Sequence, residues 1–338
     1  MSPRVAVLAG GISHERDVSR RSGRRVADAL REAGCEVLVL DVDAQLIPAL
    51  RAEAPDVVWP VLHGAVGEDG SIRDVLELLG LPYVGTRPAS CRRAWDKPVA
   101  AAVVERAGLV VPEAIALPHD LFRDLGAPAV LSAVLQRLGL PLVVKPARGG
   151  SALGVGVVRE PGDLPRAVVE CFAYGDTAVL QRFVAGTEVA VAVLDIDGAP
   201  RALPAVEIVA DGPYDYAARY TAGAVEFFAP ARLDPEAARA VAAAAERAHE
   251  ALGLRHLSRM DFIVDAQGVP HFLEANVAPG MTETSLLPLG AAAAGEDVES
   301  LYRRIVDVAV AEAVGGGTPV PRHAADGAPA TAGGLLTP

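Results

Sequence analysis

Two carboxylates, an amide and a guanidinium lie in the C-terminal part of the chain at a spacing that could hold a metal-bound phosphate. Arg259 and Asp261 are two residues apart, and so are Glu274 and Asn276. Side chains two apart on a strand share a face, so a turn near Gln267-Gly268 would bring all four together. Such oxygen ligands suit Mg²⁺ rather than zinc, because no His or Cys lies near at zinc-ligand spacing. The alternative is a salt-bridged hairpin with a solvated face.

A glycine-rich loop, Arg148–Gly154, follows Lys145 and separates two strand-like runs. Free backbone N–H groups in such a loop can surround phosphate oxygens, and the neighbouring lysine adds a positive charge. The loop is not a P-loop, because the GKS/T sequence is absent and a strand follows it. Gly10-Gly11-Ile12-Ser13 likewise lacks the dinucleotide fingerprint, which disfavours a dehydrogenase. An ordinary glycine hairpin is the alternative.

Polar residues also follow two strand-like runs near the N-terminus. Ser13–Ser19 comes after the apolar run Val5–Ala9, and His63–Gly70 comes after Val57–Leu62. Residues beyond strand ends are candidates for binding, although they can also cap helices. We expect His63 to contact an anion, whereas the other six histidines are expected on the surface or in hairpins.

A polar, aromatic segment, Tyr214–Tyr220, lies between two later strands and is followed by the acidic Glu226. Its turn-like composition is compatible with a plain surface loop. The sharper alternative is a lid that carries tyrosine and arginine side chains toward a ligand. The residues alone leave both interpretations open.

The elements that must position these residues fall into three groups. Over residues 1–96 strands alternate with helices such as Arg16–Ala33, which predicts a mostly parallel sheet with helices on both faces. In such sheets ligands bind beyond the carboxyl ends of the strands. Residues 97–184 are typical of a small α+β unit, and residues 185–314 of antiparallel strands with one long helix. Residues 315–338, rich in Gly, Pro, Ala and Thr, are expected to form a disordered tail.

Helix ends are signalled locally. Ser71–Asp74 has the form of a capping box at the start of a helix. Asp234 and Pro235 are typical of the first residues of the long helix, and Gly253 of its end. Gly34 is expected to end the first helix in a left-handed conformation.

Composition limits the class of protein. The 31 Lys and Arg residues against 43 Asp and Glu give a net charge of −12, which disfavours a nucleic-acid partner. Three widely spaced cysteines argue against a disulfide framework and are expected to be buried thiols. No apolar run approaches the roughly 20 residues of a spanning helix, and the start is too short for a signal-peptide core. The chain is therefore expected to be soluble and cytoplasmic, without a membrane partner.

These motifs, in this order, resemble those of the D-alanine–D-alanine ligases of the ATP-grasp superfamily. The matching stretches are Gly10–Ser19, Leu62–Gly70, Asp96-Lys97, Val144–Ser151, Tyr214–Tyr220, Arg259–Asp261 and Leu273–Pro288. The resemblance implies an ATP-grasp architecture of mixed α/β and α+β class. An N-terminal parallel α/β domain (1–96) with the first amino-acid site would precede two α+β lobes that clasp ATP. These lobes would be 97–184 and 185–314, the latter with the metal and oxyanion site.

The implied activity is ATP-dependent joining of two D-alanines through an acyl phosphate, for peptidoglycan precursors of the cell wall. The implied ATP contacts are Lys97, Lys145, Gly150, Ser151, Gln181, Arg182, Phe183, Val184, Glu188 and Arg219. Glu188 would hold the ribose, and Gln181–Val184 would form the hinge against adenine. Two Mg²⁺, or Mn²⁺ in their place, would be bound by Asp261, Glu274 and Asn276.

The resemblance also implies a catalytic set and a substrate-binding set. The catalytic residues would be Glu15, Ser151, Tyr220, Arg259 and the backbone N–H of Gly280. The substrate contacts would be Glu15 to the first ammonium, His63 to the first carboxylate, Arg259 to the oxyanion, and Ser285 with the Leu286 backbone to the second carboxylate. The hydroxyls of Ser151 and Tyr220 would link to Glu15 and close the lid.

Three positions depart from the family pattern. Arg219 replaces the usual lid lysine, Gln181 replaces an acidic hinge residue, and Val277 stands where threonine is common. Tyr220 favours D-alanine as the second substrate. Two alternatives stay open: an ATP-grasp ligase for another amino-acid pair, and a nucleotide-binding pseudoenzyme. Related ligases are commonly dimers, so the resemblance implies a homodimer whose other partners are small molecules.

Overall fold

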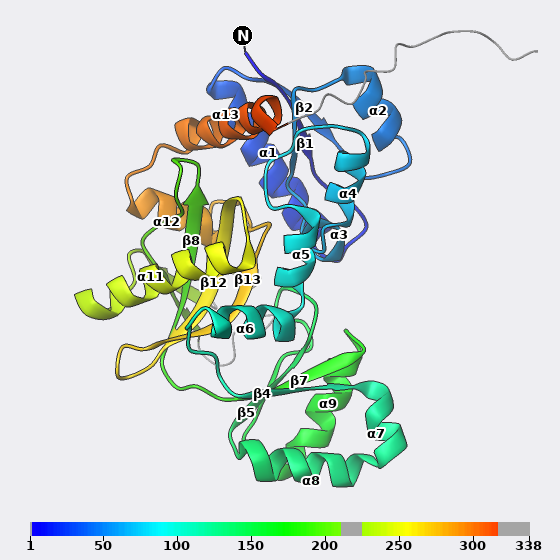
Figure 1. Ribbon diagram of the computed structural model, residues 1–338, viewed down its shortest axis with the longest axis vertical. Coiled ribbons are helices and arrows are strands. Elements are labelled where there is room, and N and C mark those ends of the chain that lie inside the picture. Colours follow the sequence, from blue (N-terminus) through cyan, green and yellow to red (C-terminus); the bar gives the residue numbers. More distant parts are fainter. Residues whose placement is uncertain (1, 211–224, 317–338) are drawn as a thin grey trace, which may run out of the picture.

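The computed structural model describes residues 2–210 and 225–316. Three sheets follow one another along the long axis of the molecule (Figure 1). A parallel sheet lies at one end, a six-stranded sheet in the middle and a four-stranded sheet at the other end. The four-stranded sheet is second in sequence but last in space, so the chain runs to the far end and returns. A parallel α/β unit followed by two α+β lobes matches the predicted fold class.

The N-terminal unit holds a parallel three-stranded sheet of order β2-β1-β3. Its strands are β1 (Arg4–Leu8), β2 (Glu36–Leu40) and β3 (Val57–Pro60). Its helices are α1 (Arg16–Glu32), α2 (Leu46–Glu53), α3 (Ala65–Glu68), α4 (Ser71–Leu78) and α5 (Pro88–Trp95). The left-handed φ of +80° at Gly34 confirms the predicted end of the first helix. The loops that follow β1 and β3 leave the same edge of the sheet, as parallel pairing requires.

The far lobe is an antiparallel sheet of order β4-β7-β5-β6. Its strands are β4 (Ala114–Pro118), β5 (Leu142–Pro146), β6 (Gly156–Val158) and β7 (Thr177–Arg182). Its helical segments are α7 (His119–Leu125), α8 (Ala127–Leu138), the 3-10 turn η1 (Pro161–Asp163) and α9 (Leu164–Phe172). Val144 and Leu180 pack into the core with α8 and α9, so their neighbours in sequence, Lys145 and Gln181, face the opposite side.

The middle sheet is antiparallel with order β11-β10-β8-β12-β13, and β9 pairs with β8. Its strands are β8 (Thr187–Asp195), β9 (Arg201–Ala202), β10 (Val206–Ala210), β11 (Val225–Phe228), β12 (His256–Val264) and β13 (Pro270–Asn276). The helices around it are α6 (Lys97–Arg106), α11 (Pro235–Leu252), α12 (Leu286–Ala293) and α13 (Val298–Gly316). The Asp234 side chain caps α11, and Gly253 ends it with a φ of +65°, as predicted.

Segments far apart in sequence share cores. Helix α13 lies beside α1 (Figure 1), and its Tyr302 meets Trp59 of β3 edge to face at 5.3 Å between ring centroids. Helix α6 buries Ala100 in the core of the middle lobe, together with Val241 of α11. The domain limits at residues 96, 184 and 314 stay predictions, and these contacts show how tightly the units are joined.

Three local expectations were wrong. Ser71 is the first residue of α4 rather than its cap, because Gly70 is the N-cap residue and its carbonyl accepts the Asp74 N–H at 2.9 Å. His249 and His256 are buried, not surface residues, and burial lowers their pKa values to about 4 and about 3. Helix α13 ends at Gly316, so its last two residues overlap the start of the expected tail.

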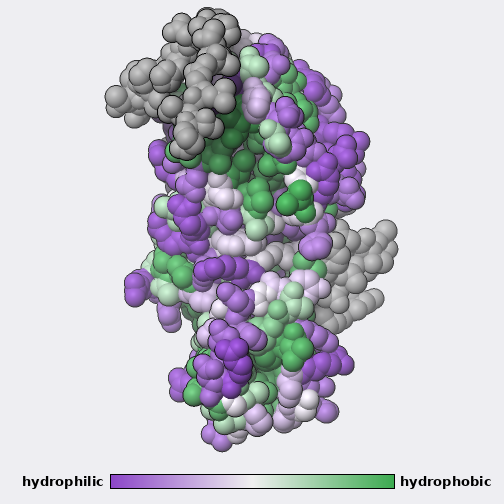
Figure 2. Space-filling view, turned by 90° about the vertical axis from the view of Figure 1, so that its right-hand side faces the viewer, coloured by the Kyte–Doolittle hydropathy of each residue, from purple (hydrophilic) through white to green (hydrophobic). Residues whose placement is uncertain are grey.

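The surface and the thiols agree with the composition. Figure 2 shows hydrophobic and hydrophilic residues intermingled over one side of the molecule, with the hydrophobic ones densest in its upper half. Exposed apolar side chains such as Leu78 of α4 are normal on protein surfaces and do not by themselves mark a docking site. Cys35, Cys91 and Cys171 are free and buried, as predicted. Within the described residues, no helix is both long and apolar enough to cross a membrane.

Candidate active site

Two adjoining cavities lie where the three units meet. The larger cavity, of about 690 Å³, is lined by residues of the four-stranded and six-stranded sheets. The smaller cavity, of about 440 Å³, is lined by the N-terminal unit, the glycine-rich loop and the middle lobe. Both are lined by Lys97, Gly149, Gly150 and Glu274. A group bound in one cavity therefore lies next to a group bound in the other.

The β12–β13 hairpin carries the four residues expected to cluster. Arg259 lies opposite Asn276 and Asp261 lies opposite Glu274, so all four share one face of the hairpin. The Arg259 guanidinium donates to both carboxylate oxygens of Asp261, with Nε–Oδ1 at 2.7 Å and Nη2–Oδ2 at 2.8 Å. Both side chains are buried, so this is a paired charge facing the cavities and not a solvated hairpin face.

Lys97 fixes the glycine-rich loop at the junction of the cavities. Its backbone N–H donates to the carbonyl of Ala147 at 2.9 Å, and its Nζ donates to the carbonyl of Gly149 at 2.7 Å. The same Nζ lies 3.3 Å from Oε2 of Glu274. One ammonium thus links the loop to the carboxylate on β13, at the point where a phosphate would pass from one cavity to the other.

Lys145 lines the larger cavity from β5. It is buried, and this burial lowers its pKa to about 8, although the nearby Glu274 carboxylate acts in the opposite direction. Gln181 of β7 lies on the same sheet face, opposite Val143 of β5. β7 ends at Arg182 and β8 begins at Thr187, so the predicted hinge Gln181–Val184 comprises the last two residues of β7 and the first two of the connection between the two antiparallel sheets.

The carboxylate of Glu15 lies among groups from distant parts of the chain. The Ser151 hydroxyl donates to its Oε1, which joins the glycine-rich loop to the start of α1. A Cβ on Gly64 would lie 2.6 Å from its Oε2, and one on Gly150 would lie 3.6 Å from Oε1. Gly64 also has a φ of +75°, so both its backbone and the close carboxylate require glycine.

His63 is buried beside this carboxylate and has partners on both ring nitrogens. Nδ1 lies 3.1 Å from the carbonyl of Ala278, which assigns the proton to Nδ1. Nε2 then accepts from the Ser22 hydroxyl at 3.2 Å. Burial lowers the pKa of His63 to about 4, so the ring is neutral at neutral pH. In this arrangement the single ring N–H is already taken by Ala278, so the ring leaves no free donor for an anion, and the expected anion contact stays a prediction.

Glu68 is a cavity residue to which the sequence analysis gave no role. Its Oε1 accepts the N–H of Gly64 at 2.9 Å. Burial, and then the charge of Glu15, raise its pKa to about 8, so the carboxyl is mostly protonated at neutral pH. A buried acid with a raised pKa in a cavity is a candidate for proton transfer. Its only sequence signal was its place in the stretch His63–Gly70.

The start of α12 forms the far wall of the smaller cavity. Ser285 is the cap residue, and its Oγ accepts the N–H of Thr282 at 3.0 Å. Gly280 packs closely against it, because a Cβ there would lie 2.7 Å from Ser285 Oγ. Backbone N–H groups at a helix start, such as that of Leu286, attract carboxylates. This wall can therefore hold an anionic group.

Comparison with known proteins identifies the family. The family description "D-ala D-ala ligase N-terminus" matches residues 46–86, and "D-ala D-ala ligase C-terminus" matches residues 103–307. The chain is 44% identical over 311 residues to the D-alanine–D-alanine ligase of Anaeromyxobacter dehalogenans, covering 92% of this chain and 98% of that protein. The chain belongs to the D-alanine–D-alanine ligase family. It is also 40% identical to the Moorella thermoacetica ligase, over 91% of this chain and 99% of that protein.

Solved ligase structures share the fold. The D-alanine–D-alanine ligase of Bacillus anthracis complexed with ATP has a TM-score of 0.79 at 27% identity, covering 94% of this chain and all of that chain. The VanG D-Ala:D-Ser ligase of Enterococcus faecalis has a TM-score of 0.79 at 26% identity, covering 91% of this chain and all of that chain. These matches confirm the predicted ATP-grasp architecture.

Each described residue that the ligase resemblance implied lines one of the two cavities. The residues of the smaller cavity are Glu15, His63, Ser151, Arg259, Asn276, Gly280, Ser285 and Leu286. Those of the larger cavity are Lys145, Gln181, Arg182, Phe183, Val184, Glu188 and Asp261. Lys97, Gly150 and Glu274 line both, whereas Arg219 and Tyr220 lie outside the described residues. Individual roles stay predictions. Lining residues that sequence reasoning missed include Glu68, Trp95, Thr282, Glu207 and Arg232.

Proposed function

We propose that the chain is an ATP-dependent ligase that joins two D-alanines into D-alanyl-D-alanine for peptidoglycan precursors. Family membership supports the reaction class, and one structural observation supports its placement. The larger and smaller cavities share Lys97, Gly149, Gly150 and Glu274. A nucleotide in the larger cavity would thus direct its terminal phosphate at a carboxylate in the smaller one.

Two chemical steps follow from this arrangement. A carboxylate is a poor electrophile toward an amine, so the first D-alanine carboxylate attacks the γ-phosphorus of ATP and the bond to ADP breaks. The second amine then attacks the acyl phosphate, and phosphate leaves from the tetrahedral intermediate. Lys97 and Lys145 offset the charge of the transferring phosphoryl group, which is the main contribution an enzyme makes to such a transfer. Adenine would lie against Gln181–Val184, and Glu188 would hold the ribose.

The hairpin cluster fits magnesium. Asp261 and Glu274 supply carboxylates and Asn276 an amide oxygen, which with phosphate oxygens is a donor set that Mg²⁺ prefers. No group of three His, Cys, Asp or Glu side chains suited to a metal occurs within residues 2–210 and 225–316, so phosphate oxygens would complete the coordination. Two Mg²⁺ held there would neutralise charge on the phosphates. Mn²⁺ has the same ligand preferences.

The smaller cavity would orient both amino acids. Glu15 would accept the first ammonium, beside His63. The Arg259 guanidinium and the Gly280 N–H would meet the oxyanion, and the Ser285–Leu286 helix start would hold the second carboxylate. One such oxyanion donor is typically worth about 10²–10³ in rate.

The second substrate needs a direct test, because D-Ala:D-Ala and D-Ala:D-Ser ligases share the fold equally well. We expect D-alanine, since the resemblance assigns Tyr220 to the lid. Phosphate release from ATP should be measured with D-alanine alone and with D-alanine plus D-serine or D-lactate, followed by product mass. Dipeptide from D-alanine alone supports the proposal, whereas turnover only with another pair would refute the substrate and keep the class. ATP binding without turnover would indicate a pseudoenzyme. The homodimer that the resemblance implies is tested by sedimentation equilibrium.

A further inference from the structure

Arg73 is a buried cation without an acidic partner. It lies on α4 with 1% of its surface exposed, and it makes no ion pair with any residue that the structure describes. Its Nη1 donates to the carbonyl of Gly67, while its buried Nε has no hydrogen-bond partner within the described part of the chain. Burying an unpaired charge is costly, and an apolar side chain of similar size would be cheaper there. Arg73 therefore fits a role other than stability.

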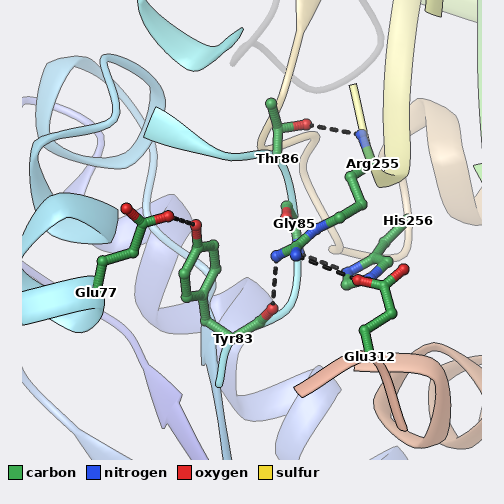
Figure 3. Close-up of polar contacts among 7 residues, drawn as sticks. All are labelled: Glu77, Tyr83, Gly85, Thr86, Arg255, His256 and Glu312. Carbon is green, nitrogen blue, oxygen red and sulfur yellow. Dashed lines mark hydrogen bonds and ion pairs between the residues drawn. The ribbon is translucent and has the colours of Figure 1, made fainter. Parts of the chain in front are cut away.

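The far side of the Arg73 guanidinium is closed by the segment Tyr83–Thr86. A Cβ on Gly85 would lie 3.2 Å from Nη2 of Arg73, so the backbone passes directly over the guanidinium. Figure 3 shows how Arg255 and His256 of the middle lobe hold this segment. Arg255 Nε donates to the carbonyl of Gly85 at 2.8 Å, and the Gly85 N–H donates to His256 Nδ1 at 3.0 Å. Because the segment is fixed from outside, Arg73 is directed toward Gly67.

The Gly67 peptide lies between two close neighbours. On one side is Arg73, and on the other a Cβ on Gly67 would lie 2.1 Å from the carbonyl oxygen of Leu62. Gly67 is part of α3, a single turn that starts after His63 and Gly64 and ends at Glu68. Short helices of one turn have little stability of their own, so external contacts decide where this one lies.

We propose that Arg73 is a positioning residue for the amino-acid cavity. Its guanidinium holds the Gly67 carbonyl and so fixes the turn that presents His63 and Glu68 to the substrate. The inference rests on the proposed function, because the smaller cavity must bind D-alanine for the effect to be seen. Arg73 lines neither the larger nor the smaller cavity, and it acts only through the turn.

The test compares Arg73→Met with Arg73→Lys in the full-length enzyme. Methionine removes the buried charge but also leaves the Gly67 carbonyl without this donor, so the two effects oppose each other and the melting temperature should change little. The KM for the first D-alanine should nevertheless rise roughly tenfold or more, as expected for loss of one charged hydrogen bond. The KM for ATP should change less than about twofold, because the larger cavity is untouched. Lysine keeps one charged donor and should recover part of the loss.

Leu30→Ala is the matched control, since Leu30 is fully buried in the same N-terminal unit but belongs to a core that contains no residue of α3. It should lower the melting temperature and leave both KM values unchanged. The proposal is overturned if Arg73→Met keeps the wild-type KM for D-alanine, or if it raises both KM values together with a loss of stability. If Arg73→Met does not fold, the same comparison is made with Arg73→Lys: the KM for D-alanine should rise more than the KM for ATP, and an unchanged KM for D-alanine overturns the proposal. A wild-type enzyme that makes no dipeptide would instead refute the proposed function.

Discussion

Replacement of Gly64 by alanine should disturb the substrate cavity far more than it destabilises the fold. The new Cβ would lie 2.6 Å from Glu15 Oε2, whereas ordinary contact begins near 3.4 Å. The carboxylate must therefore move by about 0.8 Å, and misplacement by about 1 Å can reduce rates roughly 10²-fold. The φ of +75° with ψ of −165° adds a backbone cost of about 1–3 kcal/mol. We expect kcat/KM for D-alanine to fall about 10²-fold.

Gly34→Ala is the control that separates backbone strain at positive φ from displacement of the Glu15 carboxylate. Gly34 has a similar φ of +80°, but a Cβ there has nothing within 4 Å. It should cost about 1–2 kcal/mol in urea unfolding and leave the kinetics unchanged. Both variants are compared by coupled ADP release at varied D-alanine and at varied ATP. If Gly64→Ala loses no more activity than Gly34→Ala, the placement of the Glu15 carboxylate does not govern substrate binding and the reasoning is refuted.

Three further changes test the proposed machinery. Glu274→Gln should abolish ligation while urea unfolding changes by less than about 0.5–1 kcal/mol, because the side chain is only partly buried; full activity would contradict the metal assignment. Arg259→Met leaves Asp261 buried without its partner, so the free energy of urea unfolding should fall by about 3–5 kcal/mol. The loss of an oxyanion donor should also lower kcat about 10²–10³-fold. An unchanged kcat would show that Arg259 is not part of the oxyanion site. Burial lowers the pKa of Lys145 to about 8, so the lysine loses its charge above that pH and kcat/KM for ATP should decline there. The Lys145→Arg variant stays charged and should not show this decline. If the variant has the same pH profile as the wild type, Lys145 is not the cause of the decline.

Local patterns predicted the parts of the site that lie on one hairpin or one loop. That Arg259 and Asp261 share a face with Glu274 and Asn276 followed from the two-residue period of strands and a single turn, whereas the register that pairs them is known only from the structure. The end of the first helix at Gly34 followed from glycine's freedom at positive φ. Such features depend on neighbours in sequence, which the sequence displays directly.

Features that depend on distant segments were missed. Glu68 acquires its raised pKa from burial and from Glu15, more than fifty residues earlier in the chain. His256 is buried because α13 and the segment around Gly85 cover it, and no local period indicates this. Long-range packing, rather than propensity, decided each case.

The central claim is that a D-alanine carboxylate is phosphorylated at the junction of the two cavities. The most direct measurement uses D-alanine labelled with ¹⁸O in its carboxylate, incubated with ATP and Mg²⁺, with mass spectrometry of the dipeptide and of the released phosphate. Transfer through an acyl phosphate predicts D-alanyl-D-alanine together with inorganic phosphate that carries one ¹⁸O atom from the substrate. Dipeptide accompanied by unlabelled phosphate, or ATP hydrolysis without dipeptide, would contradict the account.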